Sequence, residues 1–411
     1  MSKSKYFSNF KYPNEKTYDI NKTFITFDID NVDVGMVNSI RRTHKSINTF
    51  GFRTHPYEKN DINVIQNDSK LHNQMITDRI GLIPIHITDS QFEIDNYEFI
   101  IDVSKVINEI KTKIEITSKD IKILDIKKNT FIIEKERDKI FPKDPLTNEY
   151  IMITKIFSTN NFIEILDFSK VNKTEFKVKA KAVSSNGEEH SRWYPACVFC
   201  YENKIDEKKA IEGKKSYVKD EIKRSKDKNV TPLSKERLEK RFDTSLKERY
   251  FYEDENGEPT KFIFKIESIG VLPPLIIFYK CIIELCNRVK NLIMNFKNKN
   301  ENIITIKPSS NLPDGFMIEI KEEDDTIGNL INEHLYNLFI GKELNYIGVK
   351  KPHPLQKKIV FSVQSDKYTK EEDIINKIMI HGCQSVVNKL NALQKELEKQ
   401  KEFISELKLI K

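Results

Sequence analysis

A strand that leads into a helix with an acidic first turn occurs twice in this chain, once near each end. Residues 23–29 alternate as a strand and lead into a helix capped by Asp33 or a neighbour, and residues 316–320 lead into a helix that begins near Thr326. Each copy is followed much later by a long helix with apolar residues at spacings of three and four. Two such units in one chain are most simply folded as half-domains that pack on each other, as in a fused heterodimer.

The apolar positions of the two long helices define two predicted seams. The first begins after Pro273 and Pro274, which can only open a helix, and consists of Leu275, Phe278, Ile282, Leu285, Val289, Leu292 and Phe296. The second begins near Lys370 and consists of Met379, Cys383, Val386, Leu390, Leu393, Leu397, Ile404 and Leu407, with one break at Gln400. Asn329, on the helix of the second copy, is expected to join the pairing. Because an exposed seam leaves a large apolar surface in water, we predict that the seams bury each other within the chain, with no homodimer.

Between the two copies, the spacing of apolar residues changes to the alternation that is typical of strands. Alternation predicts strands at residues 113–116, 121–126, 130–134, 150–156, 162–168 and 176–182, so residues 91–201 are β-rich. Residues 202–257 are dominated by Lys and Glu, which predicts exposed helix and loop. Both charge signs are interleaved there, so a solvated surface is favoured over a nucleic-acid contact.

These changes predict the domain organisation. The first unit is discontinuous and comprises residues 17–90 and 258–298, with a β-rich insert over residues 91–257. Residues 299–315 contain prolines and a glycine and are expected to be a linker, and residues 316–411 form the second unit. The predicted fold class is α+β, with the two strand-helix units paired pseudo-twofold through their long helices.

Composition limits the possible classes of protein. The 411 residues suit two or three domains, and 69 basic against 62 acidic residues permit nucleic-acid binding without indicating it. Five scattered cysteines do not form a disulfide framework. The first residues lack the apolar run of a signal peptide, and we find no apolar stretch that could span a bilayer. We therefore expect a soluble intracellular protein without membrane contact.

Polar residues stand out on the two predicted short helices. Asn38, Arg41 and Arg42 share a helix whose other face is apolar. A second helix is predicted from a Ser69 cap to residue 80, with Arg79 in its last turn and Gly81 at a left-handed position that ends it. These residues could be solvated surface and helix caps, or the arginines could anchor a protein interface.

Two carboxylates on one strand suggest an enzymatic alternative. Asp28 and Asp30 lie on the same strand face and could hold a hard cation, as in nucleotidyl-transfer enzymes. The second copy has Glu319 and Lys321 instead, and no glycine-rich phosphate loop lies nearby. We therefore favour solvent-facing alternation over catalysis. Nucleotidyl transfer and stand-alone nucleic-acid binding remain the alternatives.

Cys197 and Cys200 have the spacing of half a zinc site, but nothing in the sequence completes it. The other cysteines, Cys281, Cys286 and Cys383, fall on predicted helices and are expected in the core. The histidines show no spacing typical of a triad or metal site. We expect neither a metal nor a cofactor.

Several motifs resemble a known family. The sequence VNSIRR at residues 37–42 with DRIGLIP at residues 78–84 resembles the signature of the larger alpha-like subunits of RNA polymerases, namely the third-largest subunit of RNA polymerase II and its archaeal counterpart. WYPAC at residues 193–197 and IESIG at residues 266–270 are similar to matching stretches of that subunit. DDTIGN at residues 324–329, followed by GVKKPHP at residues 348–354, resembles the smaller alpha-like partner, the eleventh subunit of RNA polymerase II and its archaeal counterpart.

The resemblance implies a non-catalytic assembly platform that works in transcription. The two units would pair through their long helices and dock the two largest polymerase subunits and small subunits, with nucleic acid contacted only through the complex. The implied docking residues are Asn38, Arg41, Arg42, Arg79, Gly81, Leu82 and Pro84. Both partners in one chain is the arrangement of large DNA viruses of eukaryotes. This implies a place in the viral factory of the host cytoplasm and in the virion.

Overall fold

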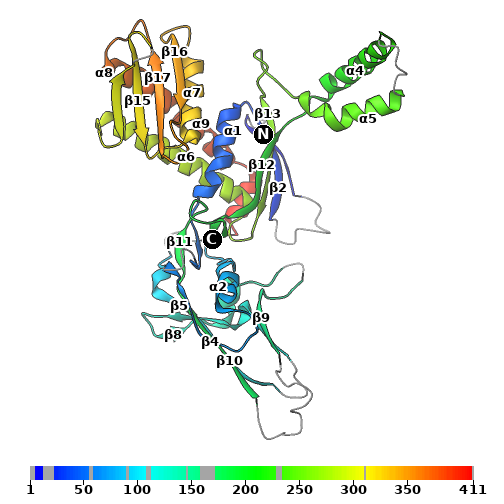
Figure 1. The fold of residues 1–411 in the computed structure, drawn as a ribbon, viewed down its shortest axis with the longest axis vertical. Helices are drawn as coiled ribbons and strands as arrows, with labels where there is room; N and C mark the ends of the chain where they lie inside the picture. The colour runs from blue at the N-terminus through cyan, green and yellow to red at the C-terminus, as the bar shows by residue number, and fades with distance from the viewer. Residues whose placement is uncertain are drawn as a thin grey trace.

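The computed structural model describes residues 5–12, 23–54, 59–88, 92–107, 113–144, 147–157, 172–227, 234–309 and 312–409. Within them the chain has the α+β fold that the sequence predicts. Figure 1 shows two sheet-and-helix units side by side, a mostly β lobe beyond the first unit, and a helical arm that extends away from it.

The first unit is an antiparallel sheet covered by two helices. Its strands, in the order β1-β2-β13-β12, are β1 (Phe7–Lys11), β2 (Phe24–Asp30), β13 (Lys261–Ser268) and β12 (Ala196–Asn203). Phe27 of β2 lies opposite Phe264 of β13, and their buried rings stack with centroids 5.7 Å apart. The helices are α1 (Val34–Thr43) and α6 (Pro274–Lys297). Alternating apolar residues on the central strands therefore supply one face for the helices to cover.

The second unit repeats this topology. Its strands, in the order β14-β15-β17-β16, are β14 (Ile304–Pro308), β15 (Gly315–Lys321), β17 (Lys358–Gln364) and β16 (Tyr346–Lys350). α7 (Asp325–Phe339) follows β15 as α1 follows β2, and α9 (Ile380–Leu397) comes after β17 as α6 comes after β13. β14 falls within the linker expected over residues 299–315. That prediction was wrong because its prolines stand at or beyond the end of an edge strand, where a missing N–H breaks no ladder bond.

The apolar faces of α6 and α9 meet in one core that draws on both units (Figure 1). The following residues of α6 are buried there: Leu275, Phe278, Ile282, Leu285, Val289, Leu292 and Phe296. The following residues of α9 are buried there too: Cys383, Val386, Leu390, Leu393 and Leu397. The sheets add Ile25 and Ile266 from the first unit and Ile318 and Phe361 from the second. Neither unit has a closed core of its own, because each sheet shares its helix layer with the other unit.

The last predicted helix is divided in two at Gln400, where the three-four spacing of the apolar residues is interrupted. α8 (Glu371–Asp373) and a π-helix (Ile374–Met379) precede α9, and α10 (Lys401–Leu407) begins at the N-cap Gln400. In α10, Phe403 and Glu406 are buried, whereas Ile404 is 42% exposed. The expectation that Ile404 continues the seam was therefore wrong, since α10 starts a new helix with a different face inward.

A second core lies in the lobe below the first unit. Its main sheet has the order β4-β10-β5-β7-β8, with β4 (Ile62–Asn67), β10 (Asn172–Ala180), β5 (Tyr97–Ile107), β7 (Ile121–Asp125) and β8 (Thr130–Phe131). Two further pairs are β6 (Lys113–Thr117) with β9 (Met152–Phe157) and β3 (Thr49–Gly51) with β11 (Val183–Ser185). The helices are α2 (Asn73–Gly81) and α3 (Glu134–Ile140). Short 3-10 helices lie at His44–Ser46, Ile94–Asn96, Ser118–Asp120, Ser191–Trp193 and Lys247–Arg249.

This lobe differs from the insert expected over residues 91–257. Its core already includes Phe50, Phe52 and Ile76, and β12, within the expected insert, belongs to the sheet of the first unit. The boundary is displaced because the apolar stripe of α2 packs in the second core, and helical periodicity does not reveal which sheet a helix covers.

Local details also differ from the expectations. α2 is capped by His72, whose Nδ1 accepts from the Gln74 N–H at 3.2 Å, rather than by Ser69. Asn67 holds Ser69 in the preceding turn through two hydrogen bonds. The strand expected over residues 130–134 is only two residues long before α3 begins. The strand expected over residues 162–168 lies outside the described residues.

The arm is a hairpin of α4 (Glu207–Asp227) and α5 (Lys235–Ser245). It continues from β12 and returns to β13, and its helices pack on each other through Val218, Leu238 and Phe242. Figure 1 shows the arm pointing away from the paired units.

The shared core predicts a large effect of a single truncation. Leu285→Ala should lower the free energy of unfolding by about 2–5 kcal/mol, because a fully buried side chain is lost and a cavity remains. Met294→Ala is the matched control, since Met294 lies on the same helix and is 58% exposed. Urea unfolding followed by circular dichroism measures both. Equal effects of the two substitutions would contradict the shared core.

Candidate functional site

The two copies of the strand-helix pattern face each other across the unit boundary. Asp33 caps α1 by accepting from the Met36 N–H at 2.7 Å, and Asp324 caps α7 by accepting from the Thr326 N–H at 3.0 Å. The Ser39 hydroxyl of α1 donates to the Thr326 carbonyl at 3.3 Å. Arg42 Nε donates to the Thr326 hydroxyl at 2.8 Å. The helix starts in the duplicated motif are thus themselves part of the interface.

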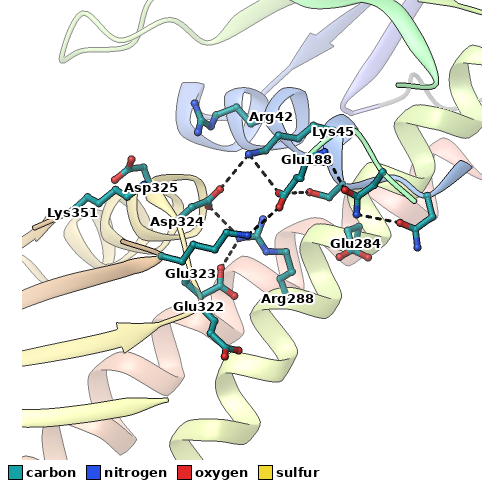
Figure 2. Close-up of a pocket in the computed structure, with 14 residues that line it drawn as sticks. Arg42, Lys45, Glu188, Glu284, Arg288, Glu322, Glu323, Asp324, Asp325 and Lys351 are labelled. Carbon is teal, nitrogen blue, oxygen red and sulfur yellow. Dashed lines mark hydrogen bonds and ion pairs between the residues drawn. The ribbon is translucent and has the colours of Figure 1, made fainter. Parts of the chain in front are cut away.

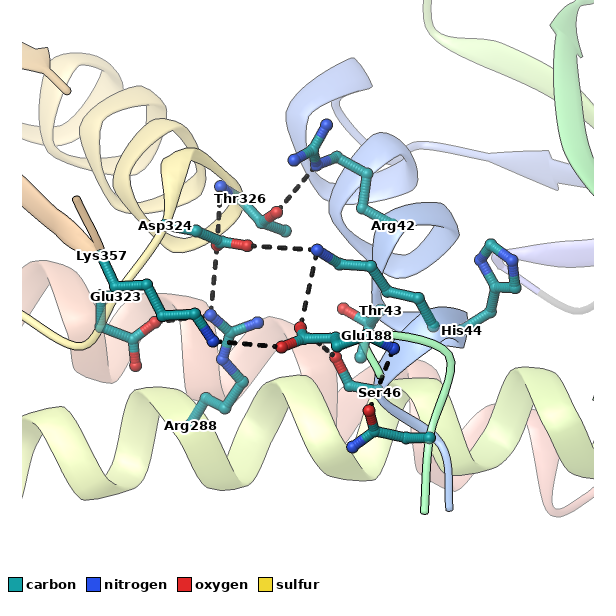
Figure 3. A network of polar contacts seen from close by, with 12 residues as sticks. Arg42, Thr43, His44, Ser46, Glu188, Arg288, Glu323, Asp324, Thr326 and Lys357 are labelled. Atoms are coloured by element: carbon teal, nitrogen blue, oxygen red, sulfur yellow. Dashed lines mark hydrogen bonds and ion pairs between the residues drawn. The ribbon is translucent and has the colours of Figure 1, made fainter. Parts of the chain in front are cut away.

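A network of charges joins three parts of the chain beside this contact (Figures 2 and 3). Arg288 of α6 lies 2.6 Å from Glu323 and 3.1 Å from Asp324 of the second unit. Lys45, just after α1, lies 3.8 Å from Asp324 and 3.5 Å from Glu188, which comes from the segment between β11 and β12. Lys357 of the second unit also reaches Glu188, at 3.4 Å. These side chains line a polar pocket of about 540 Å³.

Opposite charges keep most of this network ionised. Burial opposes ionisation of Asp324, but Arg288 and Lys45 hold the pKa of Asp324 below its usual value. Burial also opposes the charge of Arg288, yet Glu323 and Asp324 raise the pKa of Arg288. Burial raises the pKa of Glu323. Asp324 is therefore the more firmly ionised of the two carboxylates.

A buried carboxylate also caps the first seam helix from the other unit. α6 begins at Pro274 without a side-chain cap of its own. Glu406 of α10 accepts from the Leu275 N–H at 2.7 Å and from the Tyr12 hydroxyl at 3.0 Å. A negative charge at a helix N-terminus is stabilised by the unpaired N–H groups there. The end of the chain thus holds α6 in place.

A second acidic contact lies at the start of α1. The carboxylate of Glu333 on α7 lies so close to Gly35 that a Cβ at Gly35 would be 1.7 Å from Glu333 Oε2. Burial, with the nearby charges of Asp33 and Glu258, raises the pKa of Glu333 to about 7. His334 Nε2 lies 3.7 Å from Asp33, and burial lowers the pKa of His334. A side chain at position 35 would displace the Glu333 carboxylate, so Gly35 leaves room for it beside α1.

The arginines predicted at a docking face fall into two groups. Arg41 donates to the Asn38 side chain at 3.0 Å and stays half-buried on the surface of α1. Arg79 is exposed and donates to the Met152 carbonyl at 3.0 Å, and Leu82 beside it is 62% exposed. Arg42 instead points to Thr326, as Figure 3 shows, so it contributes to pairing within the chain.

Gly81 has a different role from the one expected. It is the buried last residue of α2 and does not have a positive φ. A Cβ there would lie 2.2 Å from Arg192 Nη1 and 2.6 Å from Thr54 Cγ2. The glycine is therefore required by close packing, and it cannot touch a partner directly. Pro84 follows two residues after Leu82 and is half-buried.

Asn329 was predicted to take part in the pairing, but its position on α7 is exposed, whereas its neighbours Gly328 and Leu330 are buried. Thr326 contacts α1 instead, because the buried residues of α7 include Thr326, Ile327 and Leu330. A motif shared with a family does not indicate which of its residues point inward.

Asp28 and Asp30 do not form an open metal site. Asp28 is buried, not solvent-facing as expected, because Lys204 forms an ion pair with it and the Asn9 amide donates to it at 2.5 Å. The described residues contain no group of three His, Cys, Asp or Glu side chains able to hold a metal ion. Lysine already neutralises the carboxylate that a catalytic cation would need.

The cysteines divide as their positions suggested. Cys281, Cys286 and Cys383 are buried in the seam helices. Cys197 and Cys200 are exposed on β12, and the Cys197 thiol donates to the Glu267 carbonyl at 3.4 Å. A β-bulge between Ala196 and Val198 interrupts the alternation of the strand at Cys197. Among the described helices, none is both long and apolar enough to cross a bilayer.

Sequence reasoning missed much of the charge network. Lys45, Glu188 and Arg288 were not singled out, although Arg288 had one signal, a lone arginine beside an apolar seam. Glu188 had none, because its partners are far away in the sequence. Ion pairs between distant residues depend on the fold and leave no periodic trace.

The fold and the interface define a dimerisation domain whose two halves belong to one chain. The RNA polymerase Rpb3/Rpb11 dimerisation domain family matches residues 26–289 and, as a second domain of the same description, residues 316–396. The chain belongs to this family and carries both partners as a fusion of alpha-like RNA polymerase subunits.

Two curated relatives are each similar to a short stretch of this chain. DNA-directed RNA polymerase II subunit rpb11 of Dictyostelium discoideum is 29% identical over 76 residues, which is 18% of this chain and 61% of the relative. Probable DNA-directed RNA polymerase II subunit RPB11 of Caenorhabditis briggsae is 32% identical over 72 residues, 18% of this chain and 57% of the relative. The chain thus spans little more than half the length of these relatives.

Arg288→Met should destabilise the paired units. Removing the guanidinium leaves Glu323 and Asp324 partly buried without their main counter-charge, which should cost about 2–4 kcal/mol of unfolding free energy. Adding Glu323→Gln should restore part of the loss. Lys290→Met, an exposed change on the same helix, is the control. Urea unfolding distinguishes these outcomes. An unchanged free energy of unfolding in Arg288→Met would contradict a structural role of the network.

Glu333→Gln should make stability less dependent on pH. The pKa of Glu333 is about 7 in the folded chain against an ordinary 4.5, so the folded chain binds more protons between these values and its stability falls as pH rises. At pH 8 the substitution should raise the unfolding free energy by about 1–2 kcal/mol, allowing for solvent screening.

The gain should become small near pH 4.5, where Glu333 is protonated in the folded chain and half protonated in the unfolded chain. His334 is present in both chains, so the comparison isolates Glu333. Glu301→Gln, at an exposed position, should show no such trend. Unfolding in urea from pH 4.5 to 8 tests the prediction, and a gain independent of pH would argue against it.

Proposed function

We propose that this chain is a non-catalytic subunit of a multisubunit DNA-directed RNA polymerase, on which the two largest subunits assemble. The observation that supports this most is the pairing of two Rpb3/Rpb11 dimerisation domains within one chain, through one continuous core. Fusion fixes their ratio at one to one and keeps the partner half at high effective concentration. The Lys204–Asp28 ion pair argues against nucleotidyl transfer by this chain.

The docking face for the second-largest subunit is proposed around α1 and α2. Arg41 and Asn38 present planar polar groups on α1, and Arg79 lies one turn before the exposed Leu82 on α2. An exposed leucine beside an arginine suits a protein interface, because apolar burial supplies affinity and a guanidinium group supplies directed hydrogen bonds. Small polymerase subunits would bind elsewhere on the platform.

The viral setting is also part of the proposal. Two partners in one chain and a composition rich in Lys, Asn and Ile support an origin in a large DNA virus of eukaryotes. The subunit would then work in cytoplasmic factories and travel in the virion. Affinity purification of the native protein from infected cells, followed by mass spectrometry, tests this. Recovery without any polymerase subunit would overturn the proposed function.

Arg41→Glu combined with Arg79→Glu should uncouple the platform from the second-largest subunit. Reversing two interface charges should reduce the recovery of the second-largest subunit in co-purification at least about tenfold. Both side chains lie at the surface, so the thermal unfolding midpoint should stay within a few degrees. Lys122→Glu combined with Lys139→Glu, two exposed changes on the insert lobe, is the matched control. Undiminished recovery of that subunit would contradict the docking face and leave the pairing of the two units intact.

A further inference from the structure

The arm formed by α4 and α5 has more unpaired positive charge than its sequence suggests. Four of its acids form ion pairs: Glu207 with Lys247, Glu221 with Arg224, Glu239 with Lys235, and Asp243 with Lys214. Among the described residues, the following exposed side chains of the arm form no ion pair: Lys208, Lys215, Lys219, Lys223, Arg237, Lys240 and Arg241. In the same described part of the arm, the acids Glu212, Asp220 and Glu236 are exposed without one. The free bases outnumber the free acids there.

Four of these lysines form a line along α4, which we name the α4 stripe: Lys208, Lys215, Lys219 and Lys223. At 3.6 residues per turn they project from one side of the helix, and at 1.5 Å per residue they span about 22 Å. The opposite side of α4 carries Ala210, and Val218 lies about a quarter of a turn from the row; both are buried. The α4 stripe therefore faces solvent.

The arm does not need the α4 stripe in order to fold. Its two helices are held together by their apolar contact, and lysines four residues apart repel one another on a helix. A solvated helix usually offsets such repulsion with acids on the same face, whereas here Glu212 lies within the line and Asp220 beside it, fewer than the four lysines. Binding of a linear polyanion would remove the repulsion.

The surroundings of the α4 stripe favour nucleic acid over an acidic protein. Protein interfaces depend on apolar or aromatic residues at their centre, and beside the α4 stripe the large exposed apolar side chain is Ile211. Lys215, Lys219 and Lys223 repeat at about 6 Å and Lys208 lies about 10 Å from Lys215, so the row can follow a line of phosphates. We propose that the α4 stripe binds the phosphate backbone of duplex DNA without reading its sequence.

The proposal extends beyond the platform function and does not depend on it. The test uses the full chain and a fluorescein-labelled 30-base-pair DNA duplex, with affinity measured by fluorescence anisotropy over a range of salt concentrations. Changing all four lysines of the α4 stripe to Gln preserves helix propensity, so the fold should be retained. If all four contact phosphates, the slope of log affinity against log salt should become shallower by about 3–4. Affinity at 0.1 M salt should fall at least tenfold.

A control with the same change in net charge separates the α4 stripe from general electrostatics. Lys119, Lys122, Lys135 and Lys139 are exposed on the insert lobe, and their combined change to Gln should leave the slope nearly unaltered. Equal losses in both variants, or no DNA binding by the parent chain at 50 mM salt, would overturn the proposal. Arm-dependent binding of polyglutamate with none of DNA would assign the α4 stripe to an acidic protein, and equally overturn it.

Discussion

The packing of α6 on α9 is the contact on which the rest of the structure depends. Each sheet offers one apolar face, and each is covered by helices that the other unit also uses, so the two units cannot be separated without exposing both. Glu406 strengthens this arrangement because it caps α6 from the far end of the chain. The two sheets also repeat one strand order, β1-β2-β13-β12 and β14-β15-β17-β16, so each unit presents its sheet to the shared helix layer in the same way.

The charge network around Arg288 adds orientation to this apolar core. Ion pairs at a partly buried site contribute little net stability, because desolvation offsets much of their attraction, but they disfavour arrangements that leave a charge unpaired. Here Glu188 brings the segment between β11 and β12 into contact with Lys45 of the first unit and Lys357 of the second. The insert lobe is thereby held relative to the paired units. The assembly role proposed for this chain would need such fixed geometry.

In the arm, the charge pattern along the sequence differs from the charged surface that the folded helices present. Along the chain, Lys and Glu alternate closely, which indicates a solvated surface. In the folded arm several acids are used in ion pairs, and the helix period gathers the lysines of the α4 stripe on one side. Charge composition is a property of the chain, whereas a charged surface depends on which side chains are paired and which way they face.

The sequence by itself determined the repeated strand-helix units, the two seams and the break at Gln400, because these depend on local periodicity and capping. It also indicated the α+β class. Only the tertiary structure decided that Arg42 pairs with Thr326, that Gly81 is a packing residue, that β14 replaces a linker and that α2 belongs to the second core. These outcomes depend on contacts between residues far apart in the chain, and such contacts leave no periodic signal for a single sequence to reveal.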